Sequence, residues 1–205
     1  MATTIQLHEG DRYQEDHGEV TVVTPLGADT KHNFGPASAR DAIVFTCERP
    51  GGESAVPSQT IDAVRAVQEW KAFMAHPTRN VRHVVVLLGD SELQSYDHPG
   101  LLAAYQDAGV AVHHIPYASE KSYAKIMATL DAIATNGGGA AVAVHCTHGM
   151  GRSGRVAAGW LVHRYGLSVE RAVEEALSAA RQHGTERMGS PQQLAAWIAE
   201  SENGT

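Results

Sequence analysis

Cys146, Arg152 and Ser153 lie close together in the chain, with five residues between the cysteine and the arginine. A cysteine reacts as its thiolate, and a nearby cation or helix N-terminus favours that form. The guanidinium group of arginine matches two oxygens of a phosphate, which the ammonium of lysine cannot do. A serine hydroxyl can donate a hydrogen bond to sulfur when sulfur leaves. The trio therefore predicts covalent phosphoryl transfer, with Cys146 as nucleophile, Arg152 as phosphate ligand and Ser153 as stabiliser of the departing thiolate.

The sequence around this trio predicts a strand, a loop and a helix in that order. Ala140 to Val144 is a short apolar run, and Val156 to Arg164 is a small-residue helical segment. Loop amides and a helix N-terminus then point at one spot and form a cradle for an anion. Two glycines in the loop allow positive φ and close approach. We expect the phosphoryl group to be bound by Thr147, His148, Gly149, Met150, Gly151 and Arg152.

The segment from His145 to Gly154 resembles the signature H-C-x-x-G-x-x-R-S/T-G of the Cys-dependent protein tyrosine phosphatase superfamily. A cysteine and an arginine at this spacing also occur by chance, and a lone cysteine is often a small buried apolar residue. The preceding histidine, both glycines and the strand–helix context favour the functional interpretation. The resemblance implies a metal-free phosphatase with an α/β fold, and no cofactor is expected.

A second stretch, from Glu92 to Pro116, is similar to the equivalent part of dual-specificity phosphatases of the kinase-associated type. The matching positions are Glu92, Leu93, Tyr96, Pro99, Leu101, Leu102, Tyr105, Gly109, His113, His114 and Pro116. With the loop and the following helices, the resemblance covers residues 82–199. For the paired histidines, His113 and His114, we favour a structural role.

The general acid is where the sequence departs from this family. The family has an aspartate three residues after the proline that corresponds to Pro116, and this chain has Ser119 there, followed by Glu120. A phenolic leaving group has a pKa of about 10, so its oxygen needs a proton as the P–O bond breaks. Glu120 is the preferred candidate, although a glutamate in a first helical turn is also favoured by the helix dipole. Asp90, Asp97 and the absence of any acid remain alternatives.

Three further residues have two interpretations each. Gln193 could position the water of the second step, as in some family members, but its spacing from Ser190 favours a helix cap. Arg187 could hold the loop or the substrate, yet an arginine in a polar segment is usually solvated. Cys47 could form a protective disulfide with Cys146, and we favour a buried structural cysteine instead.

Composition narrows the class of protein. The chain has 205 residues, 43% of them hydrophobic, and two cysteines far apart, so it is neither a disordered chain nor a disulfide scaffold. A net charge of −7 argues against a general nucleic-acid or acidic-membrane binder. The N-terminus does not resemble a signal peptide, and no apolar run approaches the ~20 residues of a membrane span. We expect a soluble cytoplasmic protein, in which a reactive thiol stays reduced.

Strand and helix patterns alternate along the chain. Strands are predicted at 19–24, 42–47, 84–88, 110–115 and 140–144, with loop-like residues at 26–41. Helices are predicted between 58 and 76, around 123–134, at 156–164, around 169–177 and at 191–199. Alternation implies an α/β domain with a central, largely parallel sheet flanked by helices, and an active site at the carboxyl ends of its strands. We predict one phosphatase domain over residues 1–205, with residues 1–18 as a polar extension.

The sequence thus predicts a Cys-dependent phosphatase acting on phosphotyrosine in proteins, with phosphoserine or phosphothreonine left open. A phosphatase of RNA 5′-phosphates or another phosphomonoester is the first alternative, because H-C-T-H-G also resembles RNA 5′-triphosphatases, which depend less on an aspartate. RNA binding would, however, call for a basic surface. A phosphate-binding pseudophosphatase is the alternative of another class. The expected partner is a phosphorylated protein or a small phosphoester, and the oligomeric state is open.

Overall fold

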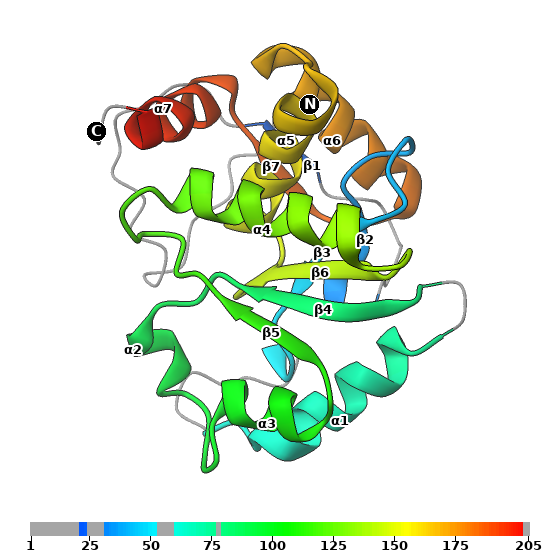
Figure 1. Ribbon diagram of the computed structural model, residues 1–205, viewed down its shortest axis with the longest axis vertical. Helices are drawn as coiled ribbons and strands as arrows, with labels where there is room; N and C mark the ends of the chain where they lie inside the picture. The colour runs from blue at the N-terminus through cyan, green and yellow to red at the C-terminus, as the bar shows by residue number, and fades with distance from the viewer. Residues whose placement is uncertain (1–20, 24–30, 53–59, 77–78, 203–205) are drawn as a thin grey trace.

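A computed structural model gives the fold and describes residues 21–23, 31–52, 60–76 and 79–202 (Figure 1). The predicted N-terminal extension, residues 1–18, lies outside the described residues. A central five-stranded sheet is covered by helices on both faces, which confirms the predicted α/β class.

The sheet has the strand order β2-β3-β6-β4-β5. Its strands are β2 (Gly35–Pro36), β3 (Val44–Glu48), β4 (Val81–Val86), β5 (Ala111–His114) and β6 (Ala141–Cys146). β6 pairs in parallel with β3 and with β4, and β4 pairs in parallel with β5, whereas β2 is antiparallel to β3. The carboxyl ends of four strands therefore meet at one edge. β6 lies in the middle of the sheet and all six of its residues are buried, which explains its continuous apolar sequence.

Two apolar cores lie on the two faces of the sheet. One face carries α4 (Ser122–Asn136), α5 (Gly151–Tyr165), α6 (Val169–His183) and α7 (Pro191–Glu202), and the other carries α1 (Ala63–Met74) and α3 (Leu101–Asp107) (Figure 1). The predicted face of α1 is confirmed, since Ala63, Val67, Trp70 and Met74 are all buried. Asp62 caps α1 and Ser168 caps α6, each accepting a hydrogen bond from the amide three residues on.

Several elements differ from the sequence-based expectation. Residues 26–41 were expected to be a loop, but they include the 3₁₀ turn η1 (Lys31–Asn33) and the short strand β2. β1 (Thr21–Val23) pairs with an unexpected strand, β7 (Arg187–Gly189), outside the main sheet. α2 (Asp90–Leu93) follows the loop after β4, and α3 was not expected either. These elements are too short for a hydrophobic period, so only their partners in space define them.

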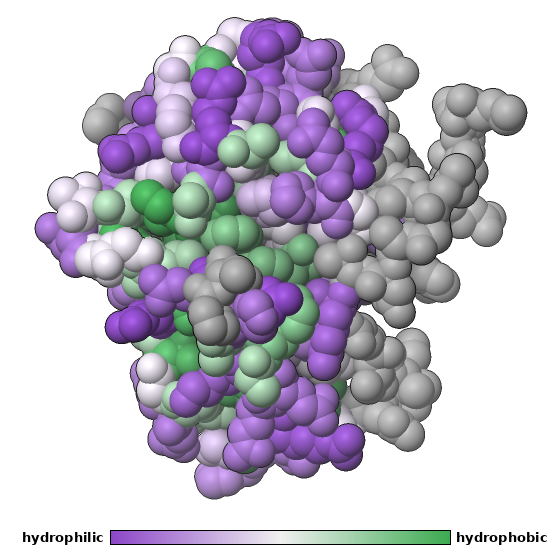
Figure 2. Space-filling model, turned by 90° about the vertical axis from the view of Figure 1, so that its right-hand side faces the viewer, coloured by the Kyte–Doolittle hydropathy of each residue, from purple (hydrophilic) through white to green (hydrophobic). Residues whose placement is uncertain are grey.

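Cys146, the last residue of β6, lies at the carboxyl edge of the sheet. The opposite edge, where β4 and β6 begin, faces the viewer in Figure 2, with hydrophilic side chains above and below a band of apolar ones. Among the described helices, none combines the length and apolarity that crossing a bilayer requires.

Candidate active site

The nucleophile candidate lies at the end of the central strand. β6 ends at Cys146, and the loop that follows leads into α5 at Gly151. We call Cys146 to Arg152 the phosphate loop. Cys146 is 3% exposed, and its Sγ lies 3.4 Å from Oγ of Ser153, in the first turn of α5. The structure thus brings the cysteine and the serine of the motif into contact beneath the loop.

The peptide groups of the phosphate loop are held in one orientation from outside. The carbonyl oxygens of residues 147–150 each accept a hydrogen bond from a donor beyond the loop. In chain order, the donors are the amide of Arg49 (3.4 Å), Nδ2 of Asn33 (3.1 Å), Nη1 of Arg187 (2.5 Å) and the amide of Met188 (3.3 Å). In a trans peptide the N–H points opposite to the C=O. The amides that follow these carbonyls therefore face inward, and those of Gly149 and Met150 donate to no backbone or side-chain acceptor within the described residues.

Glycine is required at two positions of the motif. Gly149 has a φ of +71°, and a Cβ there would lie 2.5 Å from the carbonyl carbon of Cys47 on β3. At Gly154 a Cβ would lie 2.9 Å from the carbonyl oxygen of Met188 on β7. The loop and the start of α5 are thus packed backbone to backbone against β3 and β7, which leaves no room for a side chain.

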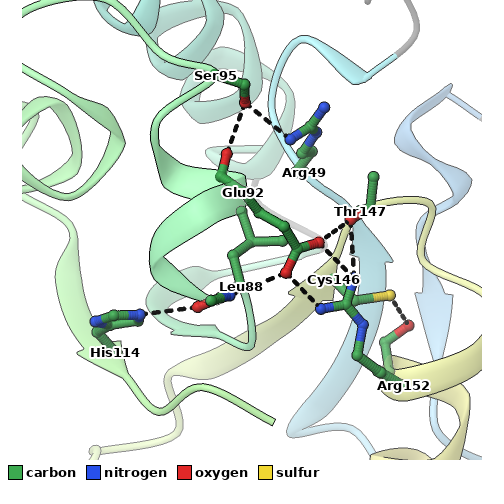
Figure 3. Close-up of polar contacts among 10 residues, drawn as sticks. Arg49, Leu88, Glu92, Ser95, His114, Cys146, Thr147 and Arg152 are labelled. Atoms are coloured by element: carbon green, nitrogen blue, oxygen red, sulfur yellow. Dashed lines mark hydrogen bonds and ion pairs between the residues drawn. The ribbon is translucent and has the colours of Figure 1, made fainter. Parts of the chain in front are cut away.

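Arg152 is bound end-on by a carboxylate that the sequence analysis matched to the family without giving it a role. Nη1 and Nη2 of Arg152 each lie 2.7 Å from an oxygen of Glu92, on α2. Oγ1 of Thr147 donates to the same carboxylate (2.5 Å) and accepts from Nη2 of Arg152 (2.9 Å). Figure 3 shows Glu92 reaching from its helix to Arg152 and Thr147, with the sulfur of Cys146 beside them.

The protonation state of Glu92 follows from these contacts. Burial alone would raise its pKa, but hydrogen bonds from Arg152, Thr147 and the amide of Gly89 lower the pKa of Glu92 to about 2. The Gly89 amide lies 2.9 Å from the carboxylate. On β5, Nε2 of His114 is 2.9 Å from the carbonyl oxygen of Leu88 and fixes the chain just before Gly89. Glu92 is therefore a carboxylate at neutral pH, suited to orient Arg152 and unsuited to donate a proton.

Within the described residues, none of the three acid candidates is hydrogen-bonded to the phosphate loop. Glu120 is exposed in the turn that precedes α4, and Asp90 is exposed at the start of α2, two residues before Glu92. Asp97 accepts a hydrogen bond from the amide of Ala63 (2.8 Å), at the start of α1. The roles proposed for Glu120 and Asp90 stay predictions.

His145, which precedes the nucleophile, is completely buried. Burial lowers its pKa to about 3, so it is neutral at physiological pH. Its ring packs against Tyr105 of α3 on the side of the sheet away from α5. It therefore adds no charge to the site.

Gln193 and Cys47 also have defined surroundings. The amide of Gln193 lies 3.4 Å from Oγ of Ser190, as in a helix cap, and its side-chain oxygen accepts a hydrogen bond from Arg155, which also donates to Tyr117 (2.7 Å). Cys47 and Cys146 are both free thiols, and burial raises the pKa of Cys47 to about 12.

Glu92, Asn33 and Arg187 are the site residues that sequence reasoning missed or left open. Arg187 was expected to be solvated, and this expectation is wrong, since it is 2% exposed. For Glu92 a signal existed, because an acid just after a buried strand lies at the carboxyl edge of a parallel sheet. Nothing local in the sequence marks Asn33 or Arg187.

Fold and site together define the class of protein. The Cys-dependent tyrosine and dual-specificity phosphatases share three features with this chain. These are a buried cysteine at the end of a central parallel strand, a loop with inward amides, and an arginine at the start of the following helix. The chain belongs to the family Tc-R-P, described as the DSP-PTPase phosphatase of polymorphic toxin systems, whose model matches residues 59–166. The predicted superfamily is confirmed.

Solved structures agree with this assignment. The active form of Tk-PTP is 25% identical over 84% of this chain and 98% of its own, with a TM-score of 0.56. A kinase-associated phosphatase with its catalytic cysteine replaced by serine is 22% identical over 79% of this chain and 89% of its own, with a TM-score of 0.59. PTPMT1 is 18% identical over 82% and 94%, with a TM-score of 0.52. The last two show the fold alone. A search of curated proteins found no match.

Proposed function

We propose that this phosphatase hydrolyses phosphotyrosine in proteins through a cysteinyl-phosphate intermediate. The observation that carries the proposal is that four consecutive loop carbonyls are hydrogen-bonded from outside the loop, so that the amides after them point into the loop that begins at Cys146. Such preorganised dipoles stabilise both a thiolate and the oxygens of a transferring phosphoryl group.

In the first step, the thiolate of Cys146 attacks phosphorus and the bond to the tyrosine oxygen breaks. Loop amides and Arg152 bind the three non-bridging oxygens, and Glu92 keeps the guanidinium of Arg152 in the plane that this requires. The leaving phenolate takes a proton from a general acid. We assign this role to Glu120, with Asp90 as the alternative because it shares a short helix with Glu92.

In the second step, water attacks the cysteinyl phosphate and the S–P bond breaks. Oγ of Ser153, 3.4 Å from Sγ, then donates a hydrogen bond to the returning thiolate. The conjugate base of the general acid takes the proton of the water, and phosphate leaves.

For the substrate class, we favour phosphoproteins over nucleic acid because the net charge is −7. A basic stripe along the surface is what an RNA 5′-phosphate substrate would need. We also propose that residues 1–205 form one phosphatase domain, since β1 near the start pairs with β7 near the end.

The proposal is tested with p-nitrophenyl phosphate and a phosphotyrosine peptide in the presence of EDTA. We expect turnover of both, inhibition by vanadate, and a loss of about a thousand-fold or more in Cys146→Ser, which should still bind the peptide. Residual activity in that variant would contradict the covalent mechanism. Faster release of phosphate from 5′-triphosphorylated RNA would favour the nucleic-acid alternative, and binding without turnover would favour a pseudophosphatase.

Two conservative variants identify the acid. Glu120→Gln should slow the phosphotyrosine peptide about 100-fold and p-nitrophenyl phosphate much less, because nitrophenolate leaves without a proton. If both substrates respond equally, Glu120 is not the acid, and Asp90→Asn should then show the selective loss.

A further inference from the structure

Arg187 is a buried cation behind the phosphate loop. It lies at the start of β7, 38 residues after Gly149, and is 2% exposed. Its guanidinium reaches Gly149 in the loop, Thr46 on β3 and Asn33 on η1. The acceptors are the carbonyl oxygens of Gly149 (2.5 Å), Glu186 (2.7 Å), Thr46 (3.1 Å) and Asn33 (3.4 Å).

Every one of these partners is a neutral carbonyl group. Carbonyls satisfy the N–H groups, but no carboxylate among the described residues bonds to Arg187 as a counter-ion. Burial lowers the pKa of Arg187 to about 10, although a thiolate at Cys146 and the carboxylate of Glu186 favour its charged form. Arg187 is therefore still a cation at neutral pH, and its hydrogen bond to Gly149 holds this charge against the phosphate loop, three residues after Cys146.

The other groups around Cys146 are neutral or form pairs of opposite charge. Arg152 is bonded to Glu92 on α2, so the pair has a formal charge of zero. On β6, His145 is neutral. At the end of β3, Glu48 and Arg49 are adjacent in sequence and of opposite sign, and Cys47 is a buried thiol with a raised pKa. Of these described groups around the loop, Arg187 is the one that adds a net positive charge.

We infer that Arg187 is a positioning residue of the phosphate site, which supplies from behind the loop the positive charge that the thiolate and the phosphoryl group require. It acts in two ways. Its charge stabilises the Cys146 thiolate across a low-dielectric interior, where Coulomb interactions are strong. Its hydrogen bond to the Gly149 carbonyl holds the next amide toward the phosphoryl group. The effect on the phosphoryl group rests on the proposed function, whereas the effect on the thiolate does not.

The test separates charge from structure with four variants. Arg187→Met removes the charge and the hydrogen bonds, and Arg187→Lys keeps the charge but loses the planar fork. Asn33→Ala removes the neutral neighbour that holds the His148 carbonyl. Arg65→Met is the matched control at an exposed arginine on α1. The readout is the rate of alkylation at Cys146 by uncharged iodoacetamide from pH 5 to 9, followed by mass spectrometry.

We expect the alkylation profile of Arg187→Met to move to higher pH, with a rate at pH 6.5 about threefold to tenfold below that of the unmodified protein. Arg187→Lys, Asn33→Ala and Arg65→Met should keep the profile. The first two should lower kcat/KM for p-nitrophenyl phosphate about tenfold, because the loop is held less firmly. Circular dichroism and thermal melting monitor folding.

An unchanged profile in folded Arg187→Met would overturn the inference, and so would an equal shift in Asn33→Ala. If Arg187→Met does not fold, Arg187→Lys decides, since a shifted profile there contradicts a role for charge and an unshifted one supports it. Alkylation needs no substrate. A protein that shows the shift but hydrolyses no phosphoester would therefore contradict the proposed function and not this inference.

Discussion

A guanidinium, a carboxylate and a hydroxyl group meet at two places in this molecule, and one of them is the candidate active site. In the site, Arg152, Glu92 and Thr147 form an arginine–carboxylate–hydroxyl cluster. Arg40 and Ser38, between β2 and β3, form another with Glu175 of α6. Nε and Nη2 of Arg40 lie 2.6 and 2.7 Å from the carboxylate, and Ser38 donates to it. We call these the site cluster and the outer cluster.

The two clusters differ in exposure and in the edge of the guanidinium that is used. The arginine side chain is 14% exposed in the site cluster and 48% exposed in the outer one. Glu92 takes the Nη1–Nη2 end of Arg152, whereas Glu175 takes the Nε–Nη2 edge of Arg40. An end-on carboxylate orients a guanidinium whose Nε–Nη2 edge suits a phosphoryl group. We propose from this comparison that the site cluster orients Arg152 for a ligand, whereas the outer cluster joins the residues before β3 to α6.

Replacing the arginine should give the largest difference in catalytic activity between the two clusters. Arg152→Lys loses the fork that matches phosphate, so kcat/KM for p-nitrophenyl phosphate should fall about 100-fold to 1000-fold. Arg40→Lys should leave kcat/KM within about twofold, because surface ion pairs contribute little. Steady-state kinetics of both variants measure this. A loss of less than about tenfold in Arg152→Lys would place the phosphate elsewhere.

Replacing the carboxylate should give the second-largest difference in activity between the two clusters. Glu92→Gln keeps the shape but weakens the hold on Arg152, and kcat should fall about tenfold to 100-fold through misorientation. Glu175→Gln should leave kcat unchanged. An increase of activity in Glu92→Gln would show instead that Glu92 competes with the substrate for Arg152.

Acid stability distinguishes the clusters without any substrate. The pKa of Glu92 is lowered to about 2 from 4.5, so its stabilisation is present above pH 4.5 and is lost as the pH falls toward 2. Over that window the unmodified protein should lose about 3 kcal/mol of unfolding free energy more than Glu92→Gln does. Burial raises the pKa of Glu175, but hydrogen bonds from Arg40 and Ser38 outweigh burial, so its pKa is lowered, as that of Glu92 is. Glu175→Gln should reduce the pH dependence less, since its partner is exposed. Urea unfolding from pH 2 to 6 measures both.

The hydroxyl groups should give the smallest effects. Thr147→Val removes one hydrogen bond to Glu92 and one to Arg152, and kcat/KM should fall about threefold to fivefold. Ser38→Ala should lower the free energy of unfolding by about 1 kcal/mol with kcat/KM unchanged. Equal effects of the two variants on kcat/KM would remove the distinction between the clusters.

Short-range features of the fold and site followed from the sequence. Cys146, Arg152 and Ser153 are close in the chain, so a strand–loop–helix pattern is enough to bring them together. Helix faces such as Ala63, Val67, Trp70 and Met74 follow from periodicity. Each of the five predicted strands begins and ends within three residues of the observed one, and the largely parallel sheet followed from alternation.

Only the tertiary structure decided what surrounds the loop. Glu92 is 60 residues from Arg152, and Asn33 is 115 residues from His148. Their contacts depend on β6 lying between β3 and β4, an order that no local pattern specifies. Arg187 has polar neighbours in sequence, yet the packing of β7 against α5 buries it. A charge enters the interior because of the partners it finds there, and these partners come from distant parts of the chain.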